Sequence, residues 1–510
     1  MFKKIFSWIL ITILCLASKP DLVLAQESIN YQSQSIKPYL EAVKAKITEF
    51  TLDNQIHFII LENHQAPTIS FTTYVDVGGA NEPDSKTGVA HFLEHLAFKG
   101  TDKIGTNNYQ EEKLILDELD QVFNKIKQAK LTGDETKLAE LETRFQQLSQ
   151  TASQYVKPNE FGQIVEIEGG VGLNATTSAD ATIYYYNFPS NKLELWMYLE
   201  SERFLNPAFR EFYTEKQVIL EERKLRTDNS PVGKMVESFL ATAFTQHPYQ
   251  RPVIGYETDL INLTRQDVSD FFETYYGGSN ITIAIVGDVN PQQVKQMAES
   301  YFGRFPLTVK PAKLNVVEPK QQETKEIIVE YPSQPWYFEG YHIPDSNHPD
   351  YVVYDIIGSI LSNGRTSRLY NSLVEEQKVA LSAAGSTGFP GDKYPNLMLF
   401  YGISAPDRNL EELATALHQE IERLKVELVS EDELNRVKTQ AKAGLLRAVD
   451  SNAGMAKLLA EYQAKTGDWR NLFNQLDEIN AVTAKDIQRV AQLTFIPENK
   501  TIGKLITVNN

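Results

Sequence analysis

Two matching stretches of sequence, TRQDV at residues 264–268 and TAKDI at residues 483–487, decide the fold of this chain. Each opens with Thr-x-x-Asp, a variant of the pattern that caps the N-terminus of a helix. The first stretch continues to NITI at residues 280–283, and the second continues, without a gap, to NKTI at residues 499–502. Both copies therefore predict an amphipathic helix, a turn and a strand.

An internal repeat of this kind predicts two homologous α+β domains, and 510 residues are too many for a single core. A looser match links the strand–helix unit of residues 69–98 to that of residues 336–361. We expect each domain to be a mostly antiparallel sheet packed with helices on one face. A Pro- and Lys-rich linker at residues 305–322 would separate a first domain, residues 46–304, from a second domain, residues 323–510.

Residues 110–155 stand apart from this plan as a charged helical hairpin with one apolar seam. Apolar residues recur at helical spacing on both sides of the turn signal at residues 132–134. The seam consists of Leu114, Leu116, Leu119, Val122, Phe123 and Ile126, then Leu138, Leu141, Phe145, Leu148 and Ala152. The hairpin carries no chemistry of its own, so we expect a surface insertion in the first domain.

The charge balance excludes one class of partner. The formal net charge is −17, from 50 Lys and Arg against 67 Asp and Glu. A protein that binds nucleic acid needs a positive surface to meet phosphate. We therefore expect no nucleic-acid partner.

The N-terminus is typical of a signal peptide. Lys3 and Lys4 give a positive start, and the apolar run that follows, residues 5–17, is too short to span a bilayer comfortably. Small residues then precede a cleavage site after Ala25. We expect an exported, periplasmic or extracytoplasmic protein with a signal peptide at residues 1–25; an uncleaved anchor is the alternative.

The mature chain that this cleavage leaves would contain no cysteine. Cys15 is the only cysteine and lies inside the predicted signal peptide. A disulfide or a cysteine–zinc site is therefore excluded. Residues 26–45 are polar, and we expect them to form a loose lead-in to the first domain.

The motif HFLEH, residues 91–95, lies on a predicted helix that begins at Val89. Positions i, i+3 and i+4 share one face of a helix, so His91, Glu94 and His95 project the same way. Two imidazoles one turn apart can bind zinc, and a carboxylate beside the second can reach a metal-bound water. This HxxEH order is the inverzincin signature. The neighbouring apolar residues argue against two solvated surface histidines.

A catalytic zinc ion needs a third protein ligand and an open position for water. His57, His64 and His247 are candidates, but the helical stretch EKQVILEE, residues 215–222, is a better source. Glu215 and Glu222 lie two turns apart on one face, so one could bind metal while the other orients a histidine. Spacing alone does not decide between Glu221 and Glu222.

With these motifs the chain resembles the pitrilysin/insulinase family of zinc peptidases. Within the family it is similar to the shorter, mitochondrial-processing-peptidase-like branch, as an exported bacterial-type member. The resemblance covers nearly all of the mature chain, including the repeat. It rests on GVAHFLEHLAFKGT at residues 88–101, GLNATTS at residues 172–178, EKQVILEE at residues 215–222 and HPY at residues 247–249.

The resemblance implies a role for each matching residue. Glu222 would be the third zinc ligand beside His91 and His95, with one zinc ion per chain. Glu94 would be the catalytic base, and Glu215 would support a ligand. Asn174 and Ala175 would lie on an edge strand that pairs with the substrate backbone, as extended peptides do. The resemblance therefore implies that His91, His95 and Glu222 bind the zinc ion.

The sequence departs from the family pattern in two places. The span from His95 to Glu222 is longer than usual in the family, and the helical hairpin accounts for the extra length. The family's second domain often supplies an arginine and a tyrosine that grip the substrate carbonyl. The matching positions here are Val374 and Leu381, whose side chains donate no hydrogen bond. We therefore expect a heterodimer in which a homologous partner supplies these two groups.

The resemblance implies a zinc metalloendopeptidase that hydrolyses peptides or unfolded polypeptides within a closed chamber. The alternative is a non-catalytic core subunit of the same fold, because some relatives keep the fold without the chemistry.

Overall fold

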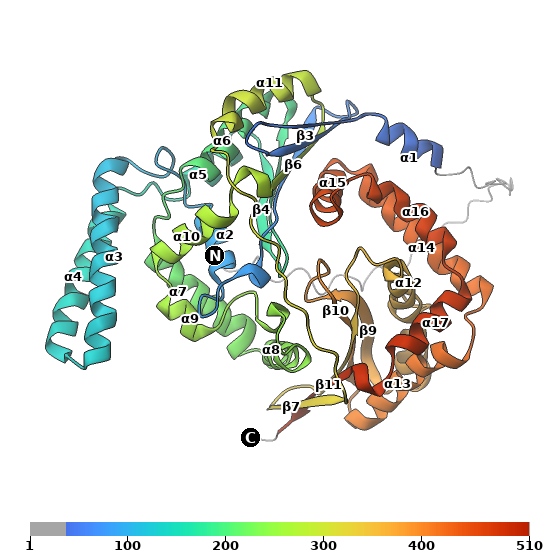
Figure 1. The fold of residues 1–510 in the computed structure, drawn as a ribbon. Helices are drawn as coiled ribbons and strands as arrows, with labels where there is room; N and C mark the ends of the chain where they lie inside the picture. Colours follow the sequence, from blue (N-terminus) through green and yellow to red (C-terminus); the bar gives the residue numbers. More distant parts are fainter. Residues whose placement is uncertain (1–36, 509–510) are drawn as a thin grey trace, which may run out of the picture. The chain divides into compact units, whose positions relative to one another are not determined.

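The computed structural model describes residues 37–508 (Figure 1). The predicted signal peptide, residues 1–25, lies outside the described residues. The first described element is helix α1 (Lys37–Lys44), so the end of the predicted loose lead-in has regular structure. Among the residues described, no helix combines the length and the apolar character that crossing a membrane requires.

Two sheets organise the chain (Figure 1). The first has the strand order β1-β2-β6-β3-β5-β4, and the second has the order β7-β11-β8-β10-β9. The strands of the first are β1 (Ile47–Thr51), β2 (His57–Glu62), β3 (Thr68–Val75), β4 (Val171–Thr177), β5 (Thr182–Pro189) and β6 (Ile281–Gly287). Those of the second are β7 (Lys325–Tyr331), β8 (Trp336–Ile343), β9 (Ala380–Phe389), β10 (Asn396–Ser404) and β11 (Lys500–Thr507).

The two sheets repeat one topology. Strand β6 pairs in parallel with β2 and antiparallel with β3. Strand β11 pairs in the same way, in parallel with β7 and antiparallel with β8. All other pairings are antiparallel. The predicted fold class, two homologous α+β units with mostly antiparallel sheets, is therefore confirmed.

The repeated Thr-x-x-Asp motifs act as the sequence predicts. Thr264 caps α10 (Arg265–Tyr275), and Thr483 caps α17 (Ala484–Thr494). In both caps the threonine hydroxyl accepts the backbone N–H of the aspartate, whose carboxylate accepts the N–H of the threonine. Each helix leads to the strand that pairs in parallel with one neighbour and antiparallel with the other, so one local signal starts the same unit twice.

Helices cover one face of each sheet, as expected, and each sheet also contacts one helix from the other half of the chain. Helix α15 contacts β3 and β6, and α8 contacts β7 and β11. The other described helices are given next in chain order. They are α2 (Val89–Leu96), α5 (Glu160–Ile167), α6 (Leu193–Leu205), α7 (Phe212–Arg223), α8 (Pro231–Ala243), α9 (Glu257–Asn262), α11 (Pro291–Tyr301), α12 (Tyr351–Ser362), α13 (Leu410–Val426), α14 (Glu431–Asp450), α15 (Asn452–Thr466) and α16 (Asn471–Ala481).

This exchange of helices explains two features of the strands. Strand β3 is buried on both faces after its first residue, although its sequence predicts a single buried face. Gly340 and Gly503 make room for α8, because a Cβ on them would lie 2.8 Å from Phe239 Cζ and 2.4 Å from Met235 Cε. The exchange joins the two halves into one unit from Val43 onward, so the domain bounds at 46–304 and 323–510 remain predictions.

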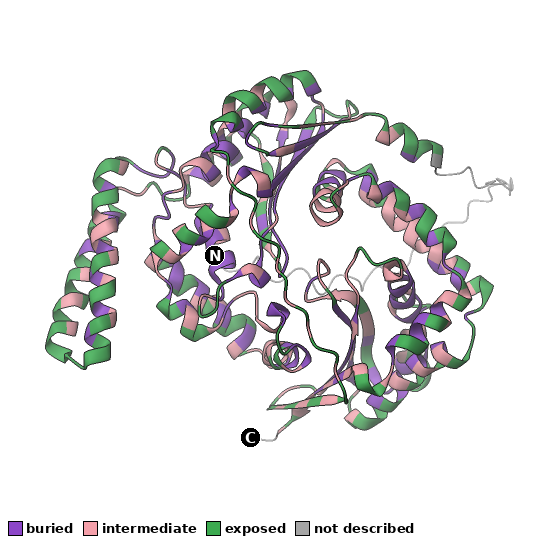
Figure 2. Ribbon diagram, in the orientation of Figure 1, coloured by how far each residue is buried: buried purple, intermediate pink, exposed green. Residues whose placement is uncertain are grey.

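The helical hairpin is present, as α3 (Tyr109–Thr132) and α4 (Glu135–Ser153), which run side by side (Figure 1). Gly133 ends α3 with a positive φ, which a glycine adopts at no steric cost. Most of the hairpin surface is exposed, and the seam is buried (Figure 2). One seam residue was misplaced by the sequence pattern: Leu114 is 71% exposed.

The N-terminus of α2, the helix that carries HFLEH, is capped from a distance. Gly88 precedes the helix with a φ of 87° and has no side chain to accept a hydrogen bond. The buried carboxylate of Glu82 takes this role, since it accepts the N–H of Gly88 and the N–H of Ala90, each at 2.9 Å.

We predict that Glu82→Ala lowers the free energy of unfolding by roughly 2–4 kcal/mol, because two buried N–H groups lose their acceptor. Urea denaturation followed by circular dichroism measures the change. Glu82→Gln keeps one acceptor oxygen and should lose less. An unchanged midpoint in Glu82→Ala would show that the cap is dispensable.

Candidate metal centre

Three side chains from two helices meet at one point. His91 and His95 lie on α2, and Glu222 lies in the last turn of α7. One potential ligand atom from each lies within 4.8 Å of the others, and this is the one such group of three or more among residues 37–508. Two imidazole nitrogens and a carboxylate oxygen are a donor set that zinc accepts.

Helix packing produces this meeting. The rings of Phe92 on α2 and Phe212 on α7 stack with centroids 4.6 Å apart. Three residues further along α7, Glu215 accepts a hydrogen bond from His95 through Oε1 and pairs with Lys99 through Oε2, at 2.8 Å and 2.7 Å. These contacts fix α7 against α2 along its length.

The free imidazole nitrogens point toward Glu222. Glu215 forms a hydrogen bond with Nδ1 of His95. Nε2 of His95 therefore remains free, and it lies 3.5 Å from Glu222 Oε2. His91 Nε2 lies 3.9 Å from the same oxygen. His91 Nδ1 is buried and has no hydrogen-bond partner among the residues described. Both histidines therefore present Nε2 to one carboxylate oxygen, an arrangement that a metal ion fits.

The protonation states suit metal binding at His91. Burial lowers the pKa of His91 to about 3, with a further decrease from the neighbouring His95 and Arg226, so the ring is neutral at pH 7. Burial also lowers the pKa of His95, but the hydrogen bond and charge of Glu215 outweigh it and raise the pKa overall. The hydrogen bond to Glu215 thus keeps the His95 ring in a fixed orientation, with a proton on Nδ1.

Glu94 lies on the same face of α2 but is not part of the three-residue cluster. Its Oε2 accepts a hydrogen bond from Thr177 Oγ1, at the end of β4, at 2.5 Å. Burial raises the pKa of Glu94, although the Thr177 hydroxyl opposes the rise. A carboxylate with a raised pKa, held beside a metal centre by one oxygen, is suited to accept a proton on the other.

Asn174 and Ala175 lie on β4, which is an edge strand of the first sheet (Figure 1). They pair with Tyr185 and Tyr184 of β5 on one side only. Asn174 is exposed and Ala175 is buried. Strand β4 also contacts α2, so the edge lies beside the helix that carries the histidines and Glu94.

The other candidate ligands lie elsewhere. His57 is near Glu49, His64 pairs with Asp288, and His247 packs against the ring of Tyr249. Glu221, which spacing left open, is 67% exposed and pairs with Lys224. The structure therefore brings Glu222, and not Glu221, to the two histidines.

The second half places no hydrogen-bonding side chain at the two positions where the family often has arginine and tyrosine. Val374 is half-buried and packs against the core of the second half. Leu381 is 54% exposed on β9.

Three partners of the site were missed from the sequence: Lys99, Thr177 and Arg226. Lys99 follows His95 by four residues, and Arg226 follows Glu222 by four, so helical spacing could have suggested both. Thr177 comes from a strand, and only the folded chain brings it to Glu94.

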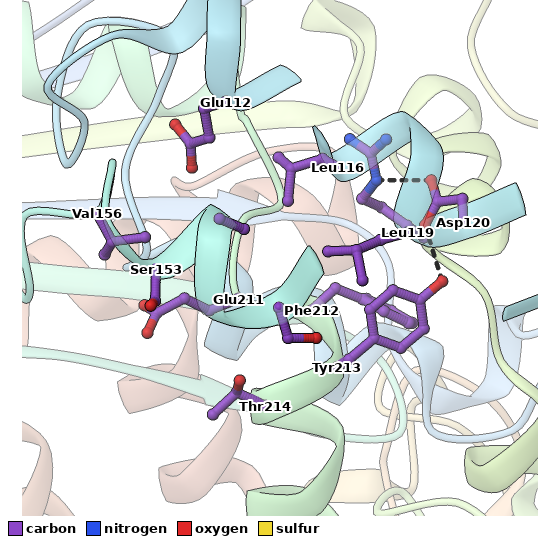
Figure 3. A pocket seen from close by; sticks show the side chains of 13 residues that line it. Glu112, Leu116, Leu119, Asp120, Ser153, Val156, Glu211, Phe212, Tyr213 and Thr214 are labelled. Carbon is purple, nitrogen blue, oxygen red and sulfur yellow. Dashed lines mark hydrogen bonds and ion pairs between the residues drawn. The ribbon is translucent and has the colours of Figure 1, made fainter. Parts of the chain in front are cut away.

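A separate pocket lies between the hairpin and α7, and none of its lining residues belongs to the metal cluster (Figure 3). Three of its polar side chains are paired with one another: Arg265 and the hydroxyl of Tyr213 both contact Asp120. We assign it no ligand.

The comparison with known proteins agrees with this geometry. Residues 57–139 and 146–257 match the family model "Insulinase (Peptidase family M16)", and residues 262–441 match "Peptidase M16 inactive domain". The chain belongs to peptidase family M16. The predicted ligands all fall in the first of these models, and the positions of Val374 and Leu381 fall in the second.

Named relatives in the M16 family include zinc proteases. The zinc protease PqqE of Helicobacter pylori is 28% identical over 483 residues, which cover 93% of this chain and 94% of the relative. A mitochondrial-processing peptidase subunit beta of Lentinula edodes is 24% identical, covering 87% of this chain and 86% of the relative.

Solved structures of M16 proteins have the same fold. A protease from Helicobacter pylori superposes with a TM-score of 0.74 at 27% identity, covering 90% of this chain and 99% of the other. The periplasmic protease PqqL of Escherichia coli gives a TM-score of 0.67 at 17% identity, covering 90% of this chain and 47% of the other, which supports the fold alone.

We predict that Glu222→Gln weakens zinc binding, because an amide is a poor ligand for zinc, whereas the neighbouring Glu221→Gln leaves zinc binding intact. Zinc content after dialysis, measured by elemental analysis, checks both variants. Equal zinc loss in the two variants, or a loss confined to Glu221→Gln, would contradict the assignment of the third ligand.

Proposed function

We propose that this chain is a zinc-dependent metalloendopeptidase that hydrolyses peptides or unfolded polypeptides. The observation that carries the proposal is the cluster of His91, His95 and Glu222 with Glu94 on the same helix face. When bound there, zinc would act as a Lewis acid on the scissile carbonyl and lower the pKa of a bound water to about 7.

The chain's own residues would then perform the proton transfers. Glu94 accepts the proton of the attacking water and gives it to the leaving amine. Thr177 donates its hydroxyl hydrogen to Oε2 of Glu94, so Oε1 is the oxygen available for the proton. Glu215 holds His95 in the orientation that presents Nε2.

The substrate class follows from the edge strand. An extended peptide can add to the open side of β4 by main-chain hydrogen bonds, beside Asn174 and Ala175. Such pairing requires an unfolded segment, and the closed chamber that the M16 resemblance implies would admit short or unfolded polypeptides. A peptide held on β4 lies next to the helix that carries Glu94, because β4 contacts α2.

We infer that the active form is a heterodimer in which this chain is the metal-bearing subunit. Val374 and Leu381 cannot donate side-chain hydrogen bonds to a substrate carbonyl. A homologous partner that carries the arginine and tyrosine would complete the site. One relative is itself named as a subunit of a peptidase. The predicted signal peptide supports export of this chain to the periplasm or another extracytoplasmic space.

We predict that Glu94→Gln keeps zinc and abolishes turnover, because the amide cannot take a proton from the attacking water. Hydrolysis of a fluorogenic peptide library, with zinc content measured on the same sample, checks both parts. Loss of zinc in this variant would contradict the role of base. Full activity with zinc retained would contradict the mechanism.

A further prediction concerns the partner. We expect the purified, zinc-loaded mature chain alone to be inactive on the peptide library and to become active with its homologous partner. Peptide cleavage by the chain alone that a chelator abolishes would establish the peptidase and overturn the need for a partner. A zinc-loaded pair that cleaves no peptide would favour the non-catalytic subunit instead.

A further inference from the structure

The two carboxylate oxygens of Glu222 have different partners. Oε2 faces the Nε2 atoms of His91 and His95, at 3.9 Å and 3.5 Å. Oε1 forms an ion pair with Nη2 of Arg226 at 2.8 Å. One oxygen of the carboxylate thus faces the two histidines, and the other pairs with a cation.

The backbone that carries Arg226 is fixed. It belongs to a π-helical turn, Lys224–Asp228, that directly follows α7. Just before the turn, the buried Arg223 donates to Gly255 O at 2.6 Å and pairs with Glu237 of α8. On the other side, a Cβ on Gly233 would lie 2.0 Å from Arg226 O, so α8 packs closely against the turn.

This arrangement matters because a carboxylate ligand has several ways to bind. It can use one oxygen, use both, or rotate away, and each choice changes the coordination number and the position left for water. A cation paired with the outer oxygen favours binding through the other oxygen, and outer partners of this kind commonly tune metal sites.

We propose that Arg226 is a positioning residue that holds Glu222 with Oε2 toward the two imidazoles. The inference rests on the proposed zinc site but goes beyond it, because neither the HxxEH motif nor the Glu-x6-Glu pattern includes this arginine. Its guanidinium is planar and permanently charged, so it suits pairing with a carboxylate better than a flexible ammonium does.

The ordinary explanation for such a contact is a surface ion pair between residues four apart, worth little energy. The Arg226 side chain is 69% exposed, which agrees with that explanation as far as stability is concerned. The same turn offers a matched control: Lys224 pairs with Glu221 at 2.7 Å, three residues apart, and neither belongs to the metal cluster. The two explanations predict different effects on metal affinity.

The test compares the full mature chain with Arg226→Ala, Arg226→Lys and Lys224→Ala. Zinc affinity is measured by competition with a chromophoric chelator, and circular dichroism of the zinc-free proteins checks the fold. We expect Arg226→Ala to bind zinc about 10–100-fold more weakly, with affinity partly recovered in Arg226→Lys and unchanged in Lys224→Ala. This pattern would not arise from a general loss of positive charge.

Two results would overturn the inference: equal zinc affinity in Arg226→Ala and the parent chain, or equal weakening in Arg226→Ala and Lys224→Ala. If Arg226→Ala does not fold, the zinc affinity of Arg226→Lys is compared with that of Lys224→Ala instead. Equal affinity in these two variants would then overturn the inference. Failure of the parent chain to bind zinc would overturn the proposed function as well, so the two failures are distinguishable without any measurement of activity.

Discussion

The site depends on one buried carboxylate, Glu215, which lies between His95 and Lys99. A buried carboxylate that lost either partner would be costly, so this contact fixes the rotation of α7 against α2. Residues seven apart lie two turns along the same helix face, so fixing Glu215 also aims Glu222 at the two imidazoles. Glu221, one residue and about 100° away around the helix, is thereby turned to solvent. The contact of Glu215 with α2 thus determines which glutamate lies beside the two histidines.

A common pattern then runs through the acids of the site. Lys99 holds one oxygen of Glu215, Arg226 holds one oxygen of Glu222, and the Thr177 hydroxyl holds one oxygen of Glu94. The other oxygen of Glu215 holds His95, and the other oxygen of Glu222 faces the Nε2 atoms of both histidines. Groups held in this way need little reorganisation when a substrate arrives, which is the main electrostatic advantage of an enzyme over water.

The sequence predicted those parts of the molecule that local periodicity determines. The HxxEH spacing was enough to place two histidines and Glu94 on one face, and the Thr-x-x-Asp repeat was enough to predict two copies of one unit. It could not choose between Glu221 and Glu222, because that choice depends on the packing of two helices far apart in the chain. It also placed Leu114 in the seam and expected one buried face for β3, since neither the hairpin packing nor the helix α15 on the second face is visible in local spacing.

The charges around His91, His95 and Glu222 agree with a site for a divalent metal ion. Four carboxylates, those of Glu94, Glu211, Glu215 and Glu222, lie near two cationic side chains, Lys99 and Arg226. A divalent ion would neutralise the remaining negative charge, and the buried setting would strengthen its effect on neighbouring groups. In the proposed reaction, its positive charge would lie where a carbonyl oxygen becomes negative during peptide hydrolysis. The two outer cations would therefore do more than hold carboxylates: by pairing with Glu215 and Glu222, they would leave more of the ion's charge for the substrate.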